Sequence, residues 1–171
     1  MIVKDSLRDI SKIMYDADNS NKTPFEALSN NFSLAHMIKP VWPGCESSSD
    51  KDFRKFLKKK NIPLFPWSSQ ARGFFLKDTL EKESYHPADP NLDEQKRVWH
   101  SEENLMKRDR CFAMAKEKGF EPIEIALAYV LNQDFPVFPL IGPRNFIETE
   151  SSVNSLKVQL TKEEMQWLDL N

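Results

Sequence analysis

The residues with the clearest chemical potential are Gly142, Pro143 and Arg144, which follow an apolar run and precede a predicted helix. Anions are stabilised between the end of a strand and the N-terminus of a helix, because free backbone N–H groups and the helix dipole both favour negative charge there. The guanidinium fork also matches phosphate oxygens. The sequence therefore predicts an anion site at Arg144. The alternative is a surface arginine of little energetic value.

Other reactive side chains lack partners at a useful spacing. Cys45 and Cys111 lie far apart and form no CxxC pair, so they predict reduced structural thiols rather than a disulfide framework or a zinc site. His86 and His100 have no accompanying cysteine or carboxylate spacing, so we assign no metal ligand.

Composition narrows the possible partners. The 171 residues are 40% hydrophobic and 29% charged, which suits one globular domain or part of one. The 24 basic and 26 acidic residues are spread along the chain and give a net charge of -2, so no nucleic-acid or membrane-surface partner is indicated. The N-terminal stretch is charged where a signal peptide is apolar, and no spanning segment is visible, so we expect a cytoplasmic protein.

Hydrophobic period and turn residues predict an alternating series of helices and strands. Helices are expected over residues 4–17, from a cap at Ser49 or Asp50 to Lys60, from a cap at Ser101 to Lys118, from Glu121 to Asn132, from Arg144 to Leu156, and from the Thr161 capping box onward with Met165 and Leu168 facing inward. Gly119 is expected to stop the third of these helices. Short apolar strands are expected over residues 24–28, 62–67 and 136–141, followed in the first case by a turn at 29–31. Residues 77–100 are polar and predict a surface excursion or a lid.

Strands separated by helices predict an α/β fold with right-handed crossovers and a parallel sheet. Three parallel strands leave two open edges, whereas a complete (β/α)8 barrel has eight strands and about 250 residues. The predicted fold class is therefore a partial (β/α)8 TIM barrel, with residues 1–171 forming a single partial domain.

Four segments of the chain together carry a family resemblance: PFEALSNNFSLA at 24–35, PLFPWSSQARGFF at 63–75, EPIEIALAYVLNQ at 121–133 and FPLIGPRNFIETESSVNSL at 138–156. They resemble the C-terminal half of the aldo-keto reductases. Their order and spacing also match, and VWPGC at 41–45 is similar to one bacterial-type branch of that family. The resemblance covers nearly the whole chain and implies the second half of the barrel.

The resemblance implies that NADP(H) lies across the C-terminal face of the barrel. Trp67 then stacks on the nicotinamide, residues 68–73 wrap the pyrophosphate, and Arg144 clasps the 2′-phosphate. The implied cofactor-binding residues are Ser29, Asn30, Trp67, Ser68, Ser69, Gln70, Ala71, Arg72, Gly73, Ile141, Gly142, Arg144, Glu148, Ser151 and Ser152. For Trp67 the alternative is core packing.

The sequence departs from the family pattern in three places. Ser29 or Asn30 stands in the region where the family commonly has a sixth-strand glutamine, and Ser151–Ser152 replaces a Glu-Asn pair near the adenine. The segments that supply the family's catalytic Asp, Tyr, Lys and His are not found in this chain. Tyr15, Tyr85 and Tyr129 lie outside the catalytic contexts, so we assign no catalytic residue.

The sequence thus predicts the NADP(H)-binding half of an oxidoreductase for carbonyl or alcohol hydride transfer, inactive without an N-terminal half. Truncation and gene splitting both remain open as its origin. The expected partners are NADP(H) and either the missing half or a second copy, since open sheet edges seek partners. The alternative is a non-catalytic interaction or scaffold module that binds no nucleotide.

Overall fold

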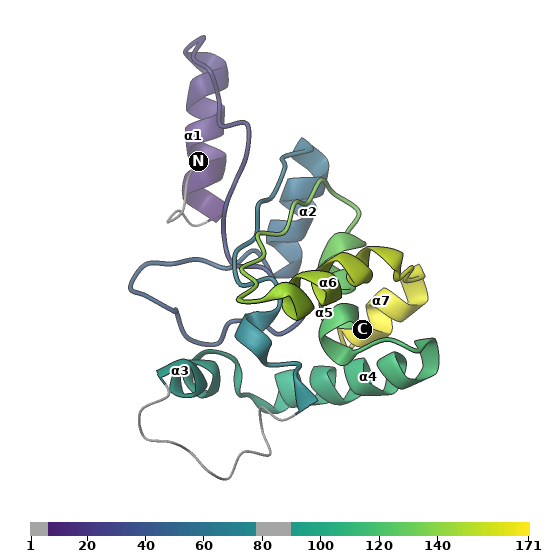
Figure 1. Cartoon of the computed structure of the whole chain (residues 1–171). Helices are drawn as coiled ribbons and strands as arrows, with labels where there is room; N and C mark the ends of the chain where they lie inside the picture. The colour runs from purple at the N-terminus through teal and green to yellow at the C-terminus, as the bar shows by residue number, and fades with distance from the viewer. Residues whose placement is uncertain (1–6, 78–89) are drawn as a thin grey trace.

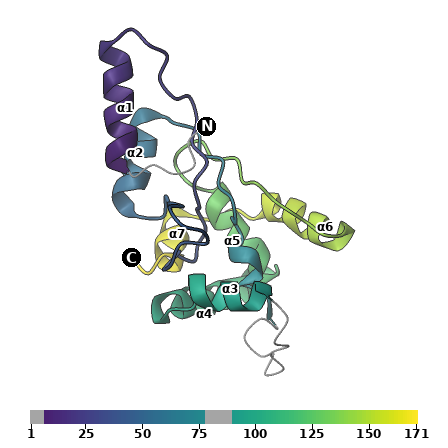
Figure 2. The same cartoon turned by 90° about the vertical axis from the view of Figure 1, so that its left-hand side faces the viewer.

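The computed structural model describes residues 7–77 and 90–171. Helix α1 lies at one end of the molecule and α4 at the opposite end, in both views (Figures 1 and 2). The elements are α1 (Leu7–Asn19), α2 (Lys51–Lys60), η1 (Ala71–Gly73), α3 (Pro90–Trp99), α4 (Glu102–Lys118), α5 (Pro122–Leu131), α6 (Phe146–Asn154), η3 (Ser155–Lys157) and α7 (Lys162–Leu168).

Local capping chemistry sets the helix boundaries. The Asp50 side chain accepts a hydrogen bond from the Phe53 N–H at 2.8 Å, and Ser101 caps α4 in the same way. Gly119 ends α4 in the left-handed region at φ 73°, where glycine avoids a steric cost. A reciprocal capping box of Thr161 and Glu164 opens α7. These predicted starts and stops are confirmed.

Three extended segments pair in parallel. Leu28 forms a bridge with Leu64, and Leu64 forms another with Val137. The N–H groups of Leu28 and Leu64 donate to the carbonyls of Pro63 and Pro136, each at 2.9 Å. The segment around Leu64 therefore lies between the other two.

The predicted parallel strands are only partly formed, because the described residues contain isolated bridges instead of regular strands. Prolines interrupt the ladder, since proline has no N–H to donate. Leu64 donates toward the third segment, so the next donor on that side would be residue 66, which is Pro66. The prediction of full-length strands over 62–67 and 136–141 is corrected accordingly.

The first predicted strand also ends too early. Asn31, which was expected in a turn, forms parallel bridges with both Ser47 and Trp67. The asparagines at 30 and 31 read as turn residues in the sequence, but the neighbouring segments supply backbone partners that keep the chain extended through Asn31.

The core lies on one face of these segments. Leu28 and Leu64 are fully buried together with Leu57 of α2 and Ile125 of α5. Burial of apolar side chains is the main favourable contribution to folding, so this cluster stabilises the packing of the helices on the paired segments. Helices therefore cover one face of the paired segments.

The opposite face is only partly covered. Phe65 and Phe138 stack on it with ring centroids 5.2 Å apart, yet Phe138 is 53% exposed and Leu140 is 48% exposed. We call this surface the bare face. Parallel sheets are normally covered on both sides.

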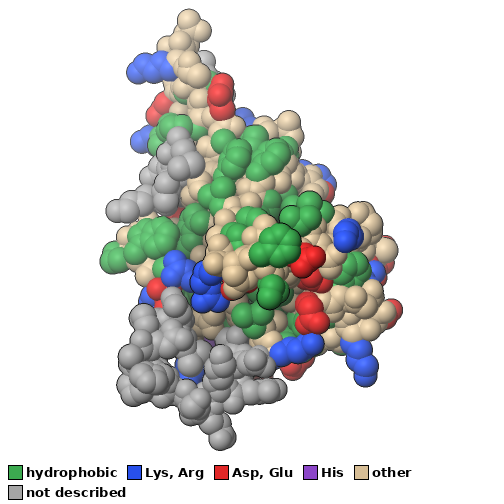
Figure 3. Space-filling view, in the orientation of Figure 1, with side chains coloured by type: hydrophobic (Ala, Val, Ile, Leu, Met, Phe, Trp, Pro, Cys, Tyr) green, Lys and Arg blue, Asp and Glu red, His purple; other side chains and the backbone are tan. Residues whose placement is uncertain are grey.

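Exposed apolar side chains continue from the bare face into α6. They are Phe138, Leu140, Ile141, Phe146, Ile147, Val153 and Leu156. Figure 3 shows hydrophobic side chains at the surface over α6 and the chain that leads into it, and Figure 2 shows α6 projecting from the rest of the molecule. An exposed apolar patch of this extent is typical of an interaction surface.

The predicted excursion at 77–100 is corrected over its second part. Residues 90–99 form α3, in which Val98 and Trp99 are fully buried. The Val98 carbonyl also accepts a hydrogen bond from the Ile38 N–H at 2.8 Å. Burial of Val98 and Trp99 stabilises this helix despite its polar composition. Residues 78–89, the first part of the predicted excursion, lie outside the described residues.

No helix in the described ranges is long and apolar enough to cross a membrane.

Candidate functional site

The segment that follows Trp67 has an unusual backbone. Ser68, Ala71, Arg72 and Gly73 have φ angles of 51°, 47°, 50° and 86°. Left-handed backbone at a residue with a Cβ costs roughly 1–2 kcal/mol, so the fold must hold this conformation. Turns between right- and left-handed residues point successive N–H groups into one concavity, which suits an anion. For the role that the sequence analysis expects of them, we call residues 68–73 the phosphate loop.

Helix α3 holds the phosphate loop from one side. The Arg72 guanidinium pairs with Glu94, and Gln95 donates a hydrogen bond to the Arg72 carbonyl. Arg72 Nε also donates to Ser68 Oγ at 3.3 Å. The loop therefore depends on tertiary contacts that no local sequence pattern shows.

Gly73 is required at its place for two reasons. Its φ of 86° disfavours any side chain, and an added Cβ would lie 3.0 Å from Leu76 Cδ1 and 3.4 Å from Gln95 Nε2. The backbone at Gly73 is therefore closely packed against Leu76 and against Gln95 of α3.

The phosphate loop contacts the chain before Arg144. Ser69 is buried, and its hydroxyl donates to the Leu140 carbonyl at 3.4 Å. Ala71 is buried beside it, whereas Gln70 is half-buried. The two predicted loops thus meet where the second and third segments end.

Arg144 is already paired within its own helix entry. The guanidinium Nη2 lies 3.0 Å from Glu148 Oε1, and the backbone N–H of Arg144 donates to Glu148 Oε2 at 2.8 Å. These hydrogen bonds, the backbone one first, lower the pKa of the Glu148 carboxyl. The Arg144 side chain is 78% exposed, so an incoming phosphate would compete with Glu148 in solvent.

The remaining residues predicted to bind the cofactor lie around α6. Ile141 and Gly142 are exposed in the chain that leads to this helix. Ser152 donates to the Glu148 carbonyl at 2.9 Å, while the Ser151 hydroxyl is buried without a described partner. Ser151 therefore retains hydrogen-bonding capacity that Ser152 has used.

The register separates Ser29 from Asn30. Bridges at Leu28–Leu64 and Asn31–Trp67 put alternate residues on one face, so Ser29 and Asn31 share the face of Trp67 and Asn30 does not. Ser29 Oγ donates to the Phe65 carbonyl at 2.9 Å. Asn30 is fully buried, and neither amide atom bonds a described residue.

Asn31 is a site neighbour that the sequence analysis missed. Its Nδ2 donates to the Trp67 carbonyl at 3.3 Å, and its Oδ1 accepts from Ser47 Oγ at 3.2 Å. The signal was present in the sequence, because residues two apart on a strand share a face with Ser29. Because a turn was predicted at 29–31, this strand alternation was not applied to Asn31.

Trp67 is in contact with a second tryptophan. The Trp42 ring lies 4.5 Å from it, centroid to centroid, at an interplanar angle of 32°. The Trp67 Nε1–H is buried and donates to no described residue. An aromatic surface is therefore present where the family resemblance implies ring stacking, but Trp42 covers part of it.

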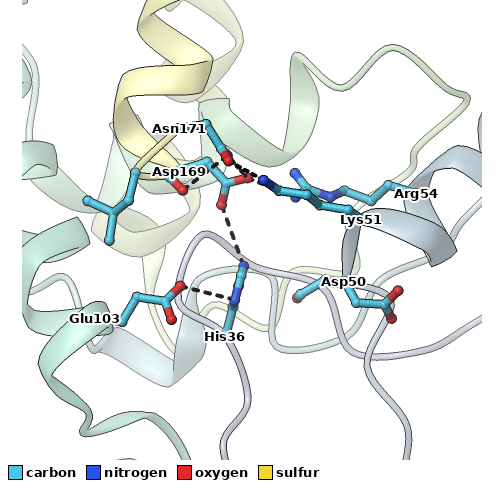
Figure 4. Close-up of a pocket in the computed structure, with 9 residues that line it drawn as sticks. His36, Asp50, Lys51, Arg54, Glu103, Asp169 and Asn171 are labelled. Carbon is cyan, nitrogen blue, oxygen red and sulfur yellow. Dashed lines mark hydrogen bonds and ion pairs between the residues drawn. The ribbon is translucent and has the colours of Figure 1, made fainter.

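His36, Arg54 and Asp169 are among the residues that line a cavity of about 240 Å³ at another place (Figure 4), and they belong to a larger buried cluster. Asp169, which is 5% exposed, pairs with Arg54 at 2.8 Å and with Lys107 at 3.0 Å. The Lys107 side chain is fully buried, and its Nζ lies 2.8 Å from His36 Nε2. Arg54 also donates to Tyr129 Oη at 2.9 Å. We call these five residues the Asp169 cluster.

The Asp169 cluster joins distant parts of the chain. Burial alone would raise the pKa of Asp169, but contacts with His36, Lys107 and Arg54 outweigh it and hold the pKa well below its ordinary value. Burial, with the Asp169 charge adding to it, raises the pKa of Tyr129. No local spacing connects these residues, so the cluster could not be predicted from the sequence.

Metal-ligating side chains are not grouped in residues 7–77 or 90–171: no three histidine, cysteine or acidic side chains there could hold an ion together. His86 lies outside the described residues, and His100 follows α3.

The sequence matches the family model of the aldo/keto reductase family over residues 5–170. It is 25% identical over 120 residues to a putative aryl-alcohol dehydrogenase, AAD16, of Saccharomyces cerevisiae, covering 70% of this chain and 34% of that protein. It is 27% identical over 129 residues to norsolorinic acid reductase stcV of Emericella nidulans, covering 73% and 31%. It is 24% identical over 156 residues to a probable aldo-keto reductase 1 of Glycine max, covering 82% and 42%. The chain thus spans less than half the length of these relatives.

The fold is similar to that of the thermostable aldo-keto reductase Tm1743, which was solved with the inhibitor epalrestat. The TM-score is 0.54 at 15% identity, covering 93% of this chain and 44% of that chain. This likeness supports an α/β fold related to the TIM barrel. The resemblance drawn from the four sequence segments is confirmed.

A glycine series tests the phosphate loop. Gly73→Ala should destabilise the protein by about 2 kcal/mol, from left-handed strain plus the contact with Leu76. Gly119→Ala should cost about 1 kcal/mol from strain alone, because nothing lies within 4 Å of its added Cβ. Gly142→Ala should leave stability unchanged or raise it by roughly a few tenths of a kcal/mol, since Gly142 has neither left-handed backbone nor an atom within 4 Å of its added Cβ. Urea midpoints give the order, and equal values for Gly73 and Gly142 would contradict this description.

Stability should depend on pH through Asp169. Because its folded pKa is lowered, the carboxylate stabilises the fold above the unfolded pKa, and this contribution is lost as pH falls below about 5. Asp169→Asn should cost about 3 kcal/mol at pH 7, since it leaves Lys107 buried without its main counter-charge. At pH 3 the difference in unfolding free energy between the wild type and Asp169→Asn should be smaller by about 1 kcal/mol, because the wild type has then lost part of the carboxylate's contribution. Urea unfolding at the two pH values measures this difference.

Asp134→Asn is the matched control. It removes one partner of the exposed Lys58–Asp134 pair and should cost under about 1 kcal/mol. Similar losses for the two variants at pH 7, or a deficit of Asp169→Asn that is the same at both pH values, would show that the Asp169 cluster does not carry this contribution.

Proposed function

Because the chain belongs to the aldo/keto reductase family, we propose that it is the NADP(H)-binding second half of a (β/α)8-barrel oxidoreductase. Members of this family use nicotinamide cofactors. The observation that carries the proposal is the phosphate loop, in which left-handed residues from Ser68 to Gly73 are held against the Leu140 carbonyl and α3. Such a strained loop is maintained only by its surroundings, as is common at ligand sites.

The choice of NADP(H) over NAD(H) rests on Arg144. The residue stands in the exposed chain before the Asn145 cap of α6, where the helix dipole favours an anion. Glu148 keeps the guanidinium fork oriented through Nε and Nη2 until a ligand arrives. A dianionic 2′-phosphate would attract the guanidinium more strongly than one carboxylate does.

The other predicted contacts complete the proposed site. Trp67 offers a ring surface for the nicotinamide, and Ser29 or Asn30 is proposed near its amide. Ser151, whose hydroxyl is buried without a described partner, and Ser152 are proposed near the adenine with Ile141, Gly142 and Glu148. When bound, NADP(H) supplies or accepts the hydride in carbonyl or alcohol chemistry. The residues of this chain bind and orient it.

The proposed site needs a further set of strands to become catalytic. The bare face carries Phe65, Phe138 and Leu140, and the relatives are more than twice as long as the matched region. We propose that the strands bearing the catalytic Asp, Tyr, Lys and His cover this face, and that hydride transfer depends on them. A cytoplasmic location is part of the proposal, and the free thiols of Cys45 and Cys111 support a reducing compartment.

A scaffold module without nucleotide binding is the second candidate. Two observations favour it: Glu148 already occupies Arg144, and Trp42 already covers part of Trp67. Such a module would present the bare face and the apolar side of α6 to another polypeptide. It predicts no affinity for either nicotinamide cofactor.

Calorimetric titration with NADPH and NADH tests the proposal. NADPH should bind more tightly than NADH, and Arg144→Ala should lower NADPH affinity about tenfold or more, because a hydrogen bond to a charged group contributes about 1.5–3 kcal/mol. NADH affinity should change little. Arg8→Ala, an exposed arginine on α1, is the control.

Two results would contradict the proposal. If neither cofactor binds, the scaffold module is favoured. If NADPH binds equally to the wild type, Arg144→Ala and Arg8→Ala, the 2′-phosphate is held elsewhere.

A further inference from the structure

Trp42 and Trp67 form an aromatic pair that no part of the proposed site explains. A centroid separation of 4.5 Å leaves no room for a third ring between them. Trp42 is 37% exposed, whereas the Trp67 ring is half-buried beneath it. Trp42 therefore covers ring surface on Trp67 that would otherwise face a ligand or solvent.

Surface polar contacts hold the segment that carries Trp42. Arg97 Nη1 donates to the Pro40 carbonyl at 2.6 Å, and its Nη2 donates to the Val41 carbonyl at 3.0 Å. Beyond Trp42 the chain turns through Gly44, at φ 76°. Both hydrogen bonds lie at the surface, where water competes for the guanidinium and for the carbonyls, so the segment can be released at modest cost.

The paired arrangement leaves one polar group unsatisfied. Trp67 Nε1 is buried and donates to no described residue. A buried donor without an acceptor destabilises the arrangement, because the hydrogen bond it made with water is lost and not replaced. A ligand that offers an acceptor to the Trp67 Nε1–H would therefore stabilise the liganded state relative to the unliganded one.

Helix α3 supports both loops at the site. Arg97 holds the carbonyls beside Trp42, while Glu94 and Gln95 hold Arg72 in the phosphate loop. The segment with Trp42 and the phosphate loop thus share one support, although they are far apart in the sequence. A ligand that contacts one loop lies close to the anchor of the other.

From this geometry we infer that Trp42 is a displaceable cap on Trp67, and that the nicotinamide ring of NADP(H) takes its place. The inference rests on the proposed function, since it needs a cofactor whose ring reaches Trp67. Trp42 then acts as a built-in competitor: it keeps the aromatic surface covered in the unliganded state and weakens binding of the ring without affecting the phosphates.

Circular dichroism reports the cap directly. Two indole rings in contact give an exciton couplet in the far ultraviolet, and the unliganded protein should show one. Saturating NADPH should abolish the couplet. Saturating 2′,5′-ADP, which has the adenosine and 2′-phosphate but no nicotinamide, should leave it intact. Trp42→Phe should lack the couplet and identify its source.

Affinities provide the second measurement. Trp42→Ala should bind NADPH about three- to tenfold more tightly than the wild type, the factor expected when one competing aromatic contact is removed. Its affinity for 2′,5′-ADP should stay unchanged. Trp167→Ala is the matched control, because Trp167 has a similar exposure of 40% and packs near Arg110 on α4. Trp42→Phe replaces Trp42→Ala if the latter does not fold, with a smaller gain expected.

Each outcome decides the inference. A couplet that persists with bound NADPH, or equal NADPH affinity in the wild type and Trp42→Ala, overturns the cap while leaving the proposed function intact. Binding of NADPH by Trp42→Ala alone supports the cap in its strongest form. If no variant binds NADPH or 2′,5′-ADP, the proposed function and the cap both fail.

Discussion

The parallel pairing of Leu64 between Leu28 and Val137 is the constraint on which the rest of the structure depends. It fixes which residues face the helices and which face away. Leu28 and Leu64 are buried under α2 and α5, while Phe65 and Phe138 stack on the other side and stay partly exposed. A parallel arrangement with one covered face is incomplete by the ordinary rules of such sheets. The bare face and the exposed side of α6 follow from this single asymmetry.

The same pairing brings the candidate site together. The phosphate loop and the chain before Arg144 both leave the ends of paired segments, and they meet at Ser69 and Leu140. On the helical side, the Asp169 cluster ties α7 to α2, α4 and residue 36. Buried ion pairs of this kind contribute less to stability than their number suggests, but removing one partner is costly. They fix the helices that cover the paired segments and thereby hold the loops above them.

Local signals predicted much of this fold. Asp50, Ser101, Gly119 and Thr161 mark helix ends through hydrogen bonds made within one turn, so their sequence context is sufficient. The Trp67–Gly73 and Gly142–Arg144 segments could be predicted as cofactor contacts because a family resemblance is carried by contiguous residues. The sequence predictions that were wrong or missing concern features that depend on tertiary contacts. Prolines reduced the strands to bridges, buried Val98 and Trp99 made a helix of a polar stretch, and Asn31, Trp42 and Asp169 acquire roles only through partners far away in the chain.

The central claim of the proposed function is that this surface holds the phosphates of NADP(H). Phosphorus NMR of NADPH observes those groups directly, without relying on tryptophan or on heat. On titration with the protein, the resonances of the 2′-phosphate and of the pyrophosphate should both shift or broaden, because the proposed function assigns the 2′-phosphate to Arg144 and the pyrophosphate to the phosphate loop. Resonances that stay at their free positions at saturating protein concentration would contradict the account.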